Sequence, residues 1–295
     1  MGVSLFSPAK LNLFLAITGR RPDGFHDLVS VAAPLDFGDR LEAEKSGPGA
    51  GSSGQFTLEC DQTEVPLDGS NLVLKAAKAY VAATGWTQVV RFRLTKRIPV
   101  GAGLGGGSSN AVAALRALNE LSGGLLDETR LAAMAATLGS DCALFLQRAP
   151  AVMRGRGEKV EPLSHDAAAR LRGRRVLIFK PSFGISTPWA YGRMVARGTD
   201  SLPAPDAEAR LSRWLGGNAP AEELLLNNME AAAFEKYPAL PLLLARLRRE
   251  AGVAAAMSGS GSACYVLLRD DQPVPAELIR ACWGRETFIQ EARLD

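Results

Sequence analysis

Residues Pro99 to Asn110 read Pro-Val-Gly-Ala-Gly-Leu-Gly-Gly-Gly-Ser-Ser-Asn, with five glycines between an expected strand and an expected helix. Glycine lets a backbone approach an oxyanion closely, and the N–H groups at a helix N-terminus, with its partial positive charge, bind phosphate. The stretch therefore predicts a phosphate-binding loop. Its expected binding residues are Gly101, Ala102, Gly103, Leu104, Gly105, Gly106, Gly107, Ser108 and Ser109.

Two well-known phosphate loops fit this stretch poorly. Gly101, Gly103 and Gly106 match the G-x-G-x-x-G dinucleotide pattern, but that fold needs an acidic residue ~20 residues after the loop, and Glu120 arrives earlier, inside a helical pattern. A Walker A loop needs Lys where Gly107 stands. A flexible glycine-rich turn stays open as an alternative, although five glycines directly before Ser-Ser are more than a turn needs.

The segments on either side of the loop have regular patterns. Alternation predicts a strand over Val89 to Leu94, and Ala111, Leu115 and Leu118 predict an amphipathic helix over Ser108 to Leu121, capped by Ser108 or Ser109. A second helix is expected from an Asp127 cap to Leu138, ended by Gly139. Asp141 follows at once and precedes an apolar run, so its carboxylate is a candidate functional group.

Between Val3 and Ile17, apolar side chains stand at the odd positions Leu5, Leu11, Leu13, Leu15 and Ile17, which predicts a half-buried strand. Lys10 and Asn12 share the even face, so their side chains are expected side by side.

The remaining pattern mixes strands and helices without regular β-α-β alternation, which predicts an α+β protein of two lobes. The expected elements are a loop over Gly47–Gly54, strands over Gln55–Cys60, Val176–Phe179 and Cys264–Leu268, helices over Leu72–Ala82, Glu222–Phe234 and Ala239–Glu250, and a loop over Pro203–Pro205. A second small-residue turn, Ser258-Gly259-Ser260-Gly261, could present N–H groups to an anion.

Composition narrows the class of protein. The chain has 295 residues, 47% hydrophobic and 22% charged, which excludes disordered and fibrous proteins. A net charge of +3 is too small to indicate a duplex-DNA partner. The four cysteines form no C-x-x-C pair, so buried free thiols in a reducing compartment are expected. Pro8, Lys10 and Asn12 interrupt the first apolar run and argue against a signal peptide, so the expected location is cytoplasmic.

In this order, Ser7 to Leu13, the glycine loop, Gly139-Ser140-Asp141 and the Ser258 to Gly261 turn resemble the motifs of the GHMP kinase superfamily, which includes galactokinase, homoserine kinase, mevalonate kinase and phosphomevalonate kinase. Ser7 to Leu15, continued by Thr18 to Leu28, is most similar to the branch that phosphorylates a cytidine diphosphate-linked methylerythritol.

The resemblance implies an N-terminal lobe like domain 2 of ribosomal protein S5, residues 1–160, and a ferredoxin-like C-terminal lobe, residues 161–295. It implies ATP and Mg²⁺ as cofactors and phosphoryl transfer to the 2-hydroxyl of the methylerythritol unit, in the non-mevalonate isoprenoid pathway. The expected partners are therefore small molecules, with no nucleic acid and no membrane.

The resemblance also assigns roles to individual residues. Asp141 is the expected general base, and Lys10 is expected to stabilise Asp141 and the transition-state charge. A serine of the loop is expected to reach Mg²⁺, and Asn71 and Lys96 are expected to contact adenine. The expected acceptor-binding residues are Asn12, Phe25, His26, Phe183, Ile185 and Thr187, with His26 hydrogen-bonding and Phe25 stacking on cytosine.

Three departures from the family pattern occur. Phe25 stands where Tyr is usual, Cys142-Ala143 where Val-Pro is usual, and Asn227-Asn228 where Asn-Asp is usual. Three other functions stay open: a kinase of the same superfamily with another acceptor, a non-catalytic ligand sensor, and an RNA-binding protein. A sensor would need only the glycine loop, whereas Lys10 and Asp141 are both present, and the basic clusters lack the interleaved aromatic residues of an RNA binder.

Overall fold

The structure is a computed structural model that describes residues 2–48, 56–198 and 201–295. Most of the expected loop Gly47–Gly54 lies outside these described residues. The chain divides into two compact units. Unit 1 comprises Met1–Ala9, Phe37–Val100 and Gly105–Gln147, and unit 2 comprises Lys10–Asp36, Gly101–Leu104 and Arg148–Asp295. The glycine loop therefore contributes residues to both units.

Unit 1 contains a sheet with strand order β3-β4-β2-β1. Strand β3 (Phe56–Cys60) pairs in parallel with β4 (Gln88–Thr95), and β4 pairs antiparallel with the second half of β2 (His26–Pro48). The beginning of β1 (Gly2–Arg20) completes the sheet. Both strands expected in this region, over Gln55–Cys60 and Val89–Leu94, are confirmed to within one or two residues.

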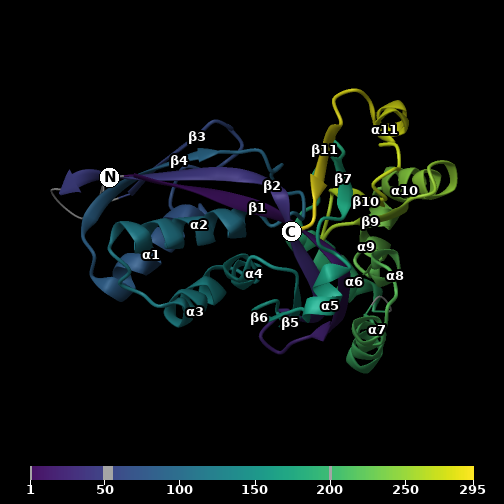
Figure 1. Cartoon of the computed structure of the whole chain (residues 1–295), viewed down its shortest axis with the longest axis horizontal. Helices are drawn as coiled ribbons and strands as arrows, with labels where there is room; N and C mark the ends of the chain where they lie inside the picture. The colour runs from purple at the N-terminus through teal and green to yellow at the C-terminus, as the bar shows by residue number, and fades with distance from the viewer. Residues whose placement is uncertain (1, 49–55, 199–200) are drawn as a thin grey trace. The chain divides into compact units, whose positions relative to one another are not determined.

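Four helices cover one face of the strands in unit 1 (Figure 1). They are α1 (Leu72–Thr84), α2 (Gly106–Leu121), α3 (Glu128–Leu138) and α4 (Cys142–Gln147). Val90, Phe92 and Leu94 of β4 point into a core shared with α1 and α2, whereas Arg91 and Arg93 alternate with them on the exposed face. This period of two in burial is the pattern of a sheet with only one face packed against a core.

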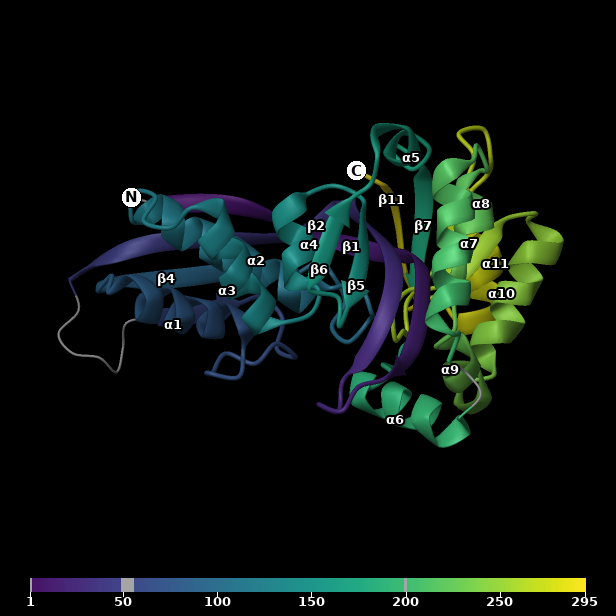
Figure 2. The ribbon, with the colours of Figure 1, turned by 90° about the horizontal axis from the view of Figure 1, so that it is seen from below.

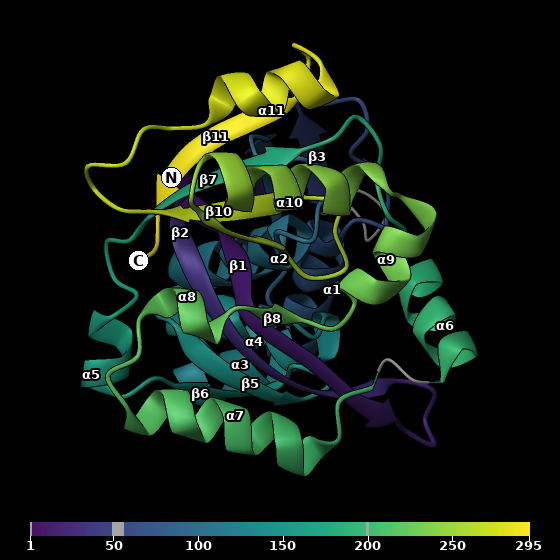
Figure 3. The ribbon, with the colours of Figure 1, turned by 90° about the vertical axis from the view of Figure 1, so that its right-hand side faces the viewer.

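Unit 2 contains an antiparallel sheet with strand order β11-β7-β10-β9. The strands are β7 (Arg175–Lys180), β9 (Ala254–Met257), β10 (Cys264–Leu268) and β11 (Phe288–Arg293). Helices α10 (Ala239–Glu250) and α11 (Ala276–Trp283) pack against this sheet (Figure 3), and every residue of β10 is buried. The expected strands over 176–179 and 264–268 and the expected helix over 239–250 are confirmed.

Unit 2 also contains strands and helices outside this sheet. They are β5 (Ala151–Gly155), β6 (Lys159–Pro162), α5 (His165–Ala169), α6 (Thr187–Arg197), α7 (Ala204–Gly216), α8 (Ala221–Leu224), β8 (Leu226–Asn227) and α9 (Glu230–Lys236). Two of these strands, β5 and β8, pair with β2 and β1. Strand β5 pairs with the first residues of β2, and β6 pairs with β5 (Figure 2). One sheet is mixed and the other is antiparallel, and together with the helices they confirm the expected α+β class.

Two local expectations were wrong. The helix expected over Glu222–Phe234 is interrupted, because Leu226 and Asn227 form the short strand β8 beside Phe14 and Leu15 of β1. The stretch Pro203–Pro205, expected to be a loop, begins helix α7, since proline is tolerated in the first turn where no N–H is needed.

Burial corrects two further expectations. The strand β1 is not half-buried: all residues from Ala9 to Ile17 are buried, including the even-numbered face. All four cysteines are free, but Cys282 is exposed and Cys60 is partly exposed, so only Cys142 and Cys264 are buried thiols. Among the described residues, no helix is long and apolar enough to span a membrane. The two units are not divided at a single point of the chain, so the expected lobe boundary at residue 160 stays a prediction.

Candidate functional site

The glycine loop has a backbone that most residues could not adopt. Gly101, Gly103 and Gly105 have φ values of 63°, 76° and 73°, so every second residue is in the left-handed region. Alternation of this kind turns successive N–H groups toward one side of the chain, as in anion-binding nests. The loop therefore has the backbone expected of a phosphate site.

Helix α2 begins earlier than expected, and its serines do not cap it. The cap residue is Gly105, which has no side chain to accept a hydrogen bond from the first turn. Ser108 and Ser109 lie inside that turn, where the Ser109 hydroxyl accepts a hydrogen bond from Ser7 at 2.8 Å and Ser108 interacts with the Cys142 thiol. Without a side-chain cap, the first N–H groups of α2 have no competing intramolecular acceptor of that kind. This is the arrangement that suits an anionic ligand.

Lys10 and Asn12 lie side by side on β1, as expected. The Lys10 ammonium donates a hydrogen bond to the side-chain oxygen of Asn12, and the exposed fractions of the two residues are only 3% and 5%. The Asn12 amide also donates to the Ser30 hydroxyl at 3.0 Å. The oxygen and the amide nitrogen of the Asn12 side chain thus both have partners inside unit 2, and one of these partners is Lys10. The expected contact of Asn12 with the acceptor stays a prediction.

Two residues that sequence reasoning missed hold this part of β1. The Ser30 hydroxyl, besides accepting from Asn12, donates to the Phe14 carbonyl at 2.6 Å. Tyr265 on β10 is fully buried and donates its hydroxyl to the Asn12 carbonyl at 2.9 Å. Burial raises the pKa of Tyr265 well above its ordinary value, so the phenol remains a donor.

The second small-residue turn packs directly against the glycine loop. The Ser258 hydroxyl donates to the Gly103 carbonyl at 3.1 Å, and the Ala263 N–H donates to the Ala102 carbonyl at 3.1 Å. A Cβ on Gly103 would overlap the Ser258 carbonyl and come within 3.0 Å of the Gly261 nitrogen. Gly103 is therefore required by this close approach, independently of any ligand.

Asp141 lies in the turn between α3 and α4, where it was expected. This turn is close to the first turn of α2, because Gly139 has both the Cys142 sulfur and the Ser108 hydroxyl beside it, at 3.3 Å and 3.4 Å from where its Cβ would lie. Burial raises the pKa of the Cys142 thiol to about 12, so this cysteine stays protonated. Unit 1 thus brings the Asp141 turn and the N-terminus of α2 together.

The two residues expected at adenine already have protein partners. The Asn71 side-chain oxygen caps α1 by accepting from the Val73 N–H at 2.9 Å, and its amide donates to the Pro66 carbonyl at 2.7 Å. Lys96 is largely buried and forms an ion pair with Asp39. The adenine assignment of Asn71 and Lys96 therefore stays a prediction.

The residues expected at cytosine lie where β1 turns into β2. Phe25 is 51% exposed, and the Arg156 guanidinium lies over its ring at 4.7 Å from the ring centre. His26 stacks on Tyr191 of α6, with ring centres 4.8 Å apart, and its buried Nε2 atom has no hydrogen-bond partner among the described residues. Burial, with a smaller contribution from the Arg20 cation, lowers the pKa of His26, which favours the neutral imidazole.

The segment that contains Phe183, Ile185 and Thr187 lies beside the Ser258 turn. The Phe183 carbonyl accepts a hydrogen bond from Ser262 at 2.6 Å, and the Thr187 hydroxyl lies 2.8 Å from that of Ser260. Ile185 is buried against Gly261. Unit 2 therefore brings these three residues, the Ser258 turn and Gly101–Leu104 of the glycine loop into one neighbourhood.

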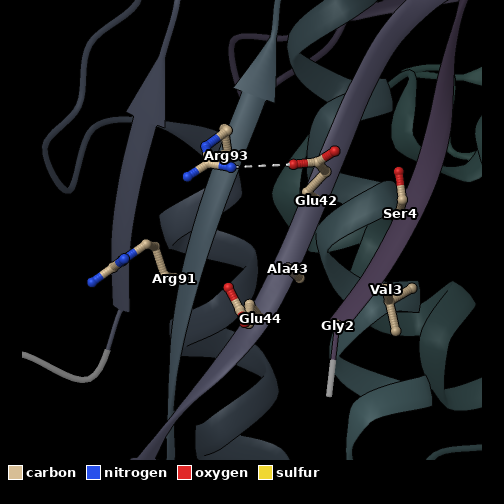
Figure 4. A pocket seen from close by; sticks show the side chains of 8 residues that line it. All are labelled: Gly2, Val3, Ser4, Glu42, Ala43, Glu44, Arg91 and Arg93. Carbon is tan, nitrogen blue, oxygen red and sulfur yellow. Dashed lines mark ion pairs between the residues drawn. The ribbon is translucent and has the colours of Figure 1, made fainter.

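One cavity of about 210 Å³ lies elsewhere, on the exposed face of the unit 1 sheet (Figure 4). Glu42 and Arg93, which form an ion pair, line it together with Arg91 and Glu44, and no expected site residue does. Among the described residues, no group of three or more His, Cys, Asp or Glu side chains could hold a metal ion.

Comparison with known proteins identifies the family of this chain. The family model of the GHMP kinases N terminal domain matches residues 71–148, and that of the GHMP kinases C terminal matches residues 209–290. A 4-diphosphocytidyl-2-C-methyl-D-erythritol kinase of Methylacidiphilum infernorum (isolate V4) is 38% identical over 306 residues, which cover 98% of this chain and 97% of the relative. The chain belongs to the family of 4-diphosphocytidyl-2-C-methyl-D-erythritol kinases.

Solved structures agree with membership of this kinase family. A crystal structure of a 4-(cytidine 5'-diphospho)-2C-methyl-D-erythritol kinase is 34% identical, has a TM-score of 0.75, and the match covers 99% of this chain and 100% of that one. A mevalonate kinase of Methanococcus jannaschii, 12% identical with a TM-score of 0.74 over 100% and 99% of the two chains, shares the fold. The expected GHMP kinase fold is confirmed.

One departure from the kinase family pattern has a structural explanation. Asn228, where Asp is usual, accepts from the Ile17 N–H at 2.9 Å and donates to the Ile17 carbonyl at 2.9 Å. An Asp could make only the first of these bonds, since an ionised carboxylate has no donor. The amide of Asn228 thus adds one hydrogen bond to the attachment of β1.

Proposed function

We propose that this chain transfers the γ-phosphoryl group of ATP to the 2-hydroxyl of 4-diphosphocytidyl-2-C-methyl-D-erythritol, a step of the non-mevalonate isoprenoid pathway. The relatives named for this kinase activity support the proposal. The structural observation that carries it lies within unit 1, where the turn of Asp141 is close to the uncapped first turn of α2. A carboxylate in a turn near a phosphate-binding helix terminus is suited to act as the base in phosphoryl transfer to an alcohol.

In the proposed reaction, the 2-hydroxyl oxygen forms a bond to the γ-phosphorus while the bond from that phosphorus to the β,γ-bridging oxygen breaks. Asp141 accepts the hydroxyl proton, and ADP leaves with the electron pair of the broken bond. The N–H groups of the glycine loop and of α2 bind the triphosphate. Lys10, fixed by Asn12, contributes positive charge to the transition state.

Mg²⁺ fits the residues present, although the chain provides few ligands of its own. Mg²⁺ in kinases is held mainly by substrate phosphates and water, with one or two protein oxygens. The half-buried hydroxyl of Ser108 suits this role better than that of Ser109, which is buried and bonded to Ser7. When bound, Mg²⁺ would neutralise charge on the phosphates.

The cytidine part of the acceptor is assigned to His26 and Phe25, with Phe183, Ile185 and Thr187 on the same unit. In the part of the chain that the structure describes, the buried Nε2 of His26 has no hydrogen-bond partner, and because buried polar atoms are nearly always bonded, we assign it a hydrogen bond to cytosine. The exposed ring of Phe25 is available for stacking.

We also propose that the two lobes comprise residues 1–160 and 161–295, and that the protein is located in the cytoplasm.

The proposal is tested by ADP release with a panel of acceptors. We expect ATP-dependent turnover with the cytidine diphosphate-linked methylerythritol and none with mevalonate, homoserine or galactose. Turnover with one of the other acceptors would show that the proposed substrate is wrong. Ligand binding without any turnover would indicate a sensor.

A further inference from the structure

Asp39 on β2 is a buried carboxylate with four hydrogen-bond donors around it. Its exposed fraction is 1%, and the donors are two backbone N–H groups and two side chains. Gly38 allows this position, because a Cβ there would overlap the backbone of Ser7 and Pro8 on β1. Burying a charge is costly unless its partners satisfy it, and Asp39 meets that condition.

The partners of Asp39 lie on both sides of the glycine loop. One oxygen accepts from the N–H groups of Arg97 and Ile98, at 2.7 Å and 2.8 Å, just before the loop begins. The other accepts from Asn110 on α2 at 2.9 Å, just after the loop ends. Asn110 in turn donates to the Ser7 hydroxyl at 2.8 Å. One carboxylate therefore fixes the two ends of the loop relative to each other within unit 1.

Asp39 also fixes a cation at the start of α2. Its second oxygen forms the buried ion pair with Lys96. A Cβ on Gly106, the first residue of α2, would lie 2.8 Å from the Lys96 Nζ, so this ammonium lies against the helix N-terminus. The helix terminus is itself partly positive, so Lys96 would be repelled from it without a compensating anion.

We propose that Asp39 is a positioning residue for ATP, which acts by holding Lys96 and both flanks of the glycine loop in the geometry that binds the nucleotide. The inference rests on the proposed function only in taking ATP as the ligand of the loop. A purely structural role would lower stability alone, whereas a positioning role changes nucleotide affinity selectively.

The test compares Asp39→Asn with Asn119→Asp in the full chain. The first change keeps an acceptor for Arg97 and Ile98 but turns an NH₂ group toward Lys96 and Asn110, so that only donors converge there. Asn119 is the matched control at the other end of α2, where its oxygen accepts from Tyr80 and Leu126 and its amide donates to the Leu126 carbonyl. Affinity for a non-hydrolysable ATP analogue is measured by calorimetry, together with Tm and the KM of each substrate.

We expect Asp39→Asn to weaken analogue binding at least about tenfold while the acceptor KM changes less than about twofold. Asn119→Asp should lower Tm with unchanged analogue binding. If Asp39→Asn does not fold, Asn110→Ala, which leaves the ion pair in place, should still weaken analogue binding several-fold. Unchanged analogue binding in the folded variant, or equal weakening by Asn119→Asp, overturns the proposal. Absence of turnover in the unmodified chain would instead overturn the proposed function and leave the binding comparison valid.

Discussion

The hydroxyl of Tyr265, at the centre of the unit 2 sheet, donates a hydrogen bond to the backbone carbonyl of Asn12 at 2.9 Å. The two residues are 253 positions apart in the chain. Because the Asn12 side chain binds the Lys10 ammonium, this bond links the deepest strand of the sheet to the proposed catalytic lysine. The bond therefore helps to hold the part of β1 that carries Lys10.

Tyr265→Phe removes only this hydroxyl and leaves the Asn12 carbonyl buried without its donor, at a cost of about 1–3 kcal/mol. We expect lower Tm and a several-fold lower kcat, with the KM for ATP unchanged. Tyr80→Phe is the matched control, since Tyr80 is equally buried and its hydroxyl donates to Asn119 in unit 1. If Tyr80→Phe lowers kcat as much as Tyr265→Phe does, the effect is one of general stability.

Gly107→Ala is a direct probe of the phosphate site. Its Cβ would meet only the Leu72 Cδ1 atom at 3.6 Å, an ordinary contact, and alanine favours the helix by about 1 kcal/mol over glycine. Stability should therefore be unchanged or higher, while the added methyl group takes space that the triphosphate needs. We expect ATP affinity to fall about tenfold or more, by calorimetry.

The control for this change is Gly216→Ala on α7, where an added Cβ meets nothing within 4 Å. Normal ATP affinity in Gly107→Ala would show that the triphosphate does not lie against the first turn of α2.

Asp141→Asn keeps the size of the side chain but removes the base. General-base assistance contributes about 10²–10⁴ in rate, so kcat should fall by that factor with ATP affinity nearly unchanged. Asp127→Asn, at the cap of α3 in the same unit, should leave kcat unchanged because asparagine caps a helix equally well. A kcat within a few-fold of normal, together with a lower Tm, would make Asp141 a turn residue.

His26→Gln and His26→Ala test the cytosine contact. Loss of a hydrogen bond to the base costs about 1–3 kcal/mol, so the acceptor KM should rise about 5–150-fold in His26→Ala, while the KM for ATP stays constant. A parallel rise in both KM values would indicate a folding defect.

The lowered pKa of His26 also predicts a pH dependence of stability. As pH falls below about 6.5, the unfolded chain takes up a proton that folded His26 resists, so stability decreases toward acid. Tm should therefore decrease less between pH 8 and pH 5 in His26→Gln than in the unmodified chain. His165→Gln, at the only other histidine, which is exposed, is the control. An unchanged Tm profile in His26→Gln would contradict the assigned burial.

The sequence predicted those parts of the site that depend on local pattern. Glycines at 101, 103 and 105 are needed for positive φ, and Asp141 follows the end of a helix, as expected. The helix α4 that begins directly after Asp141 was not expected. Lys10 and Asn12 could be paired because a strand has a period of two.

Residues whose role depends on distant partners could not be predicted in this way. Asp39 follows Gly38 in an ordinary strand pattern, and its side-chain partners lie 57 and 71 positions away. Tyr265 looks like any aromatic residue of a buried strand. The break in the expected helix over 222–234 has the same origin, because pairing with β1 outweighs local helix preference at Leu226 and Asn227.

The most direct test of the account is the structure of the product, determined by phosphorus NMR after reaction of the chain with ATP and the cytidine diphosphate-linked methylerythritol. The carbon of the 2-hydroxyl carries a methyl group and no hydrogen, so a phosphate there has no vicinal coupling to a carbinol proton. We predict one new phosphomonoester signal without such coupling, beside an intact diphosphate linkage and ADP. A monoester signal split by carbinol protons, or ADP formed without any monoester, would contradict transfer to the 2-hydroxyl.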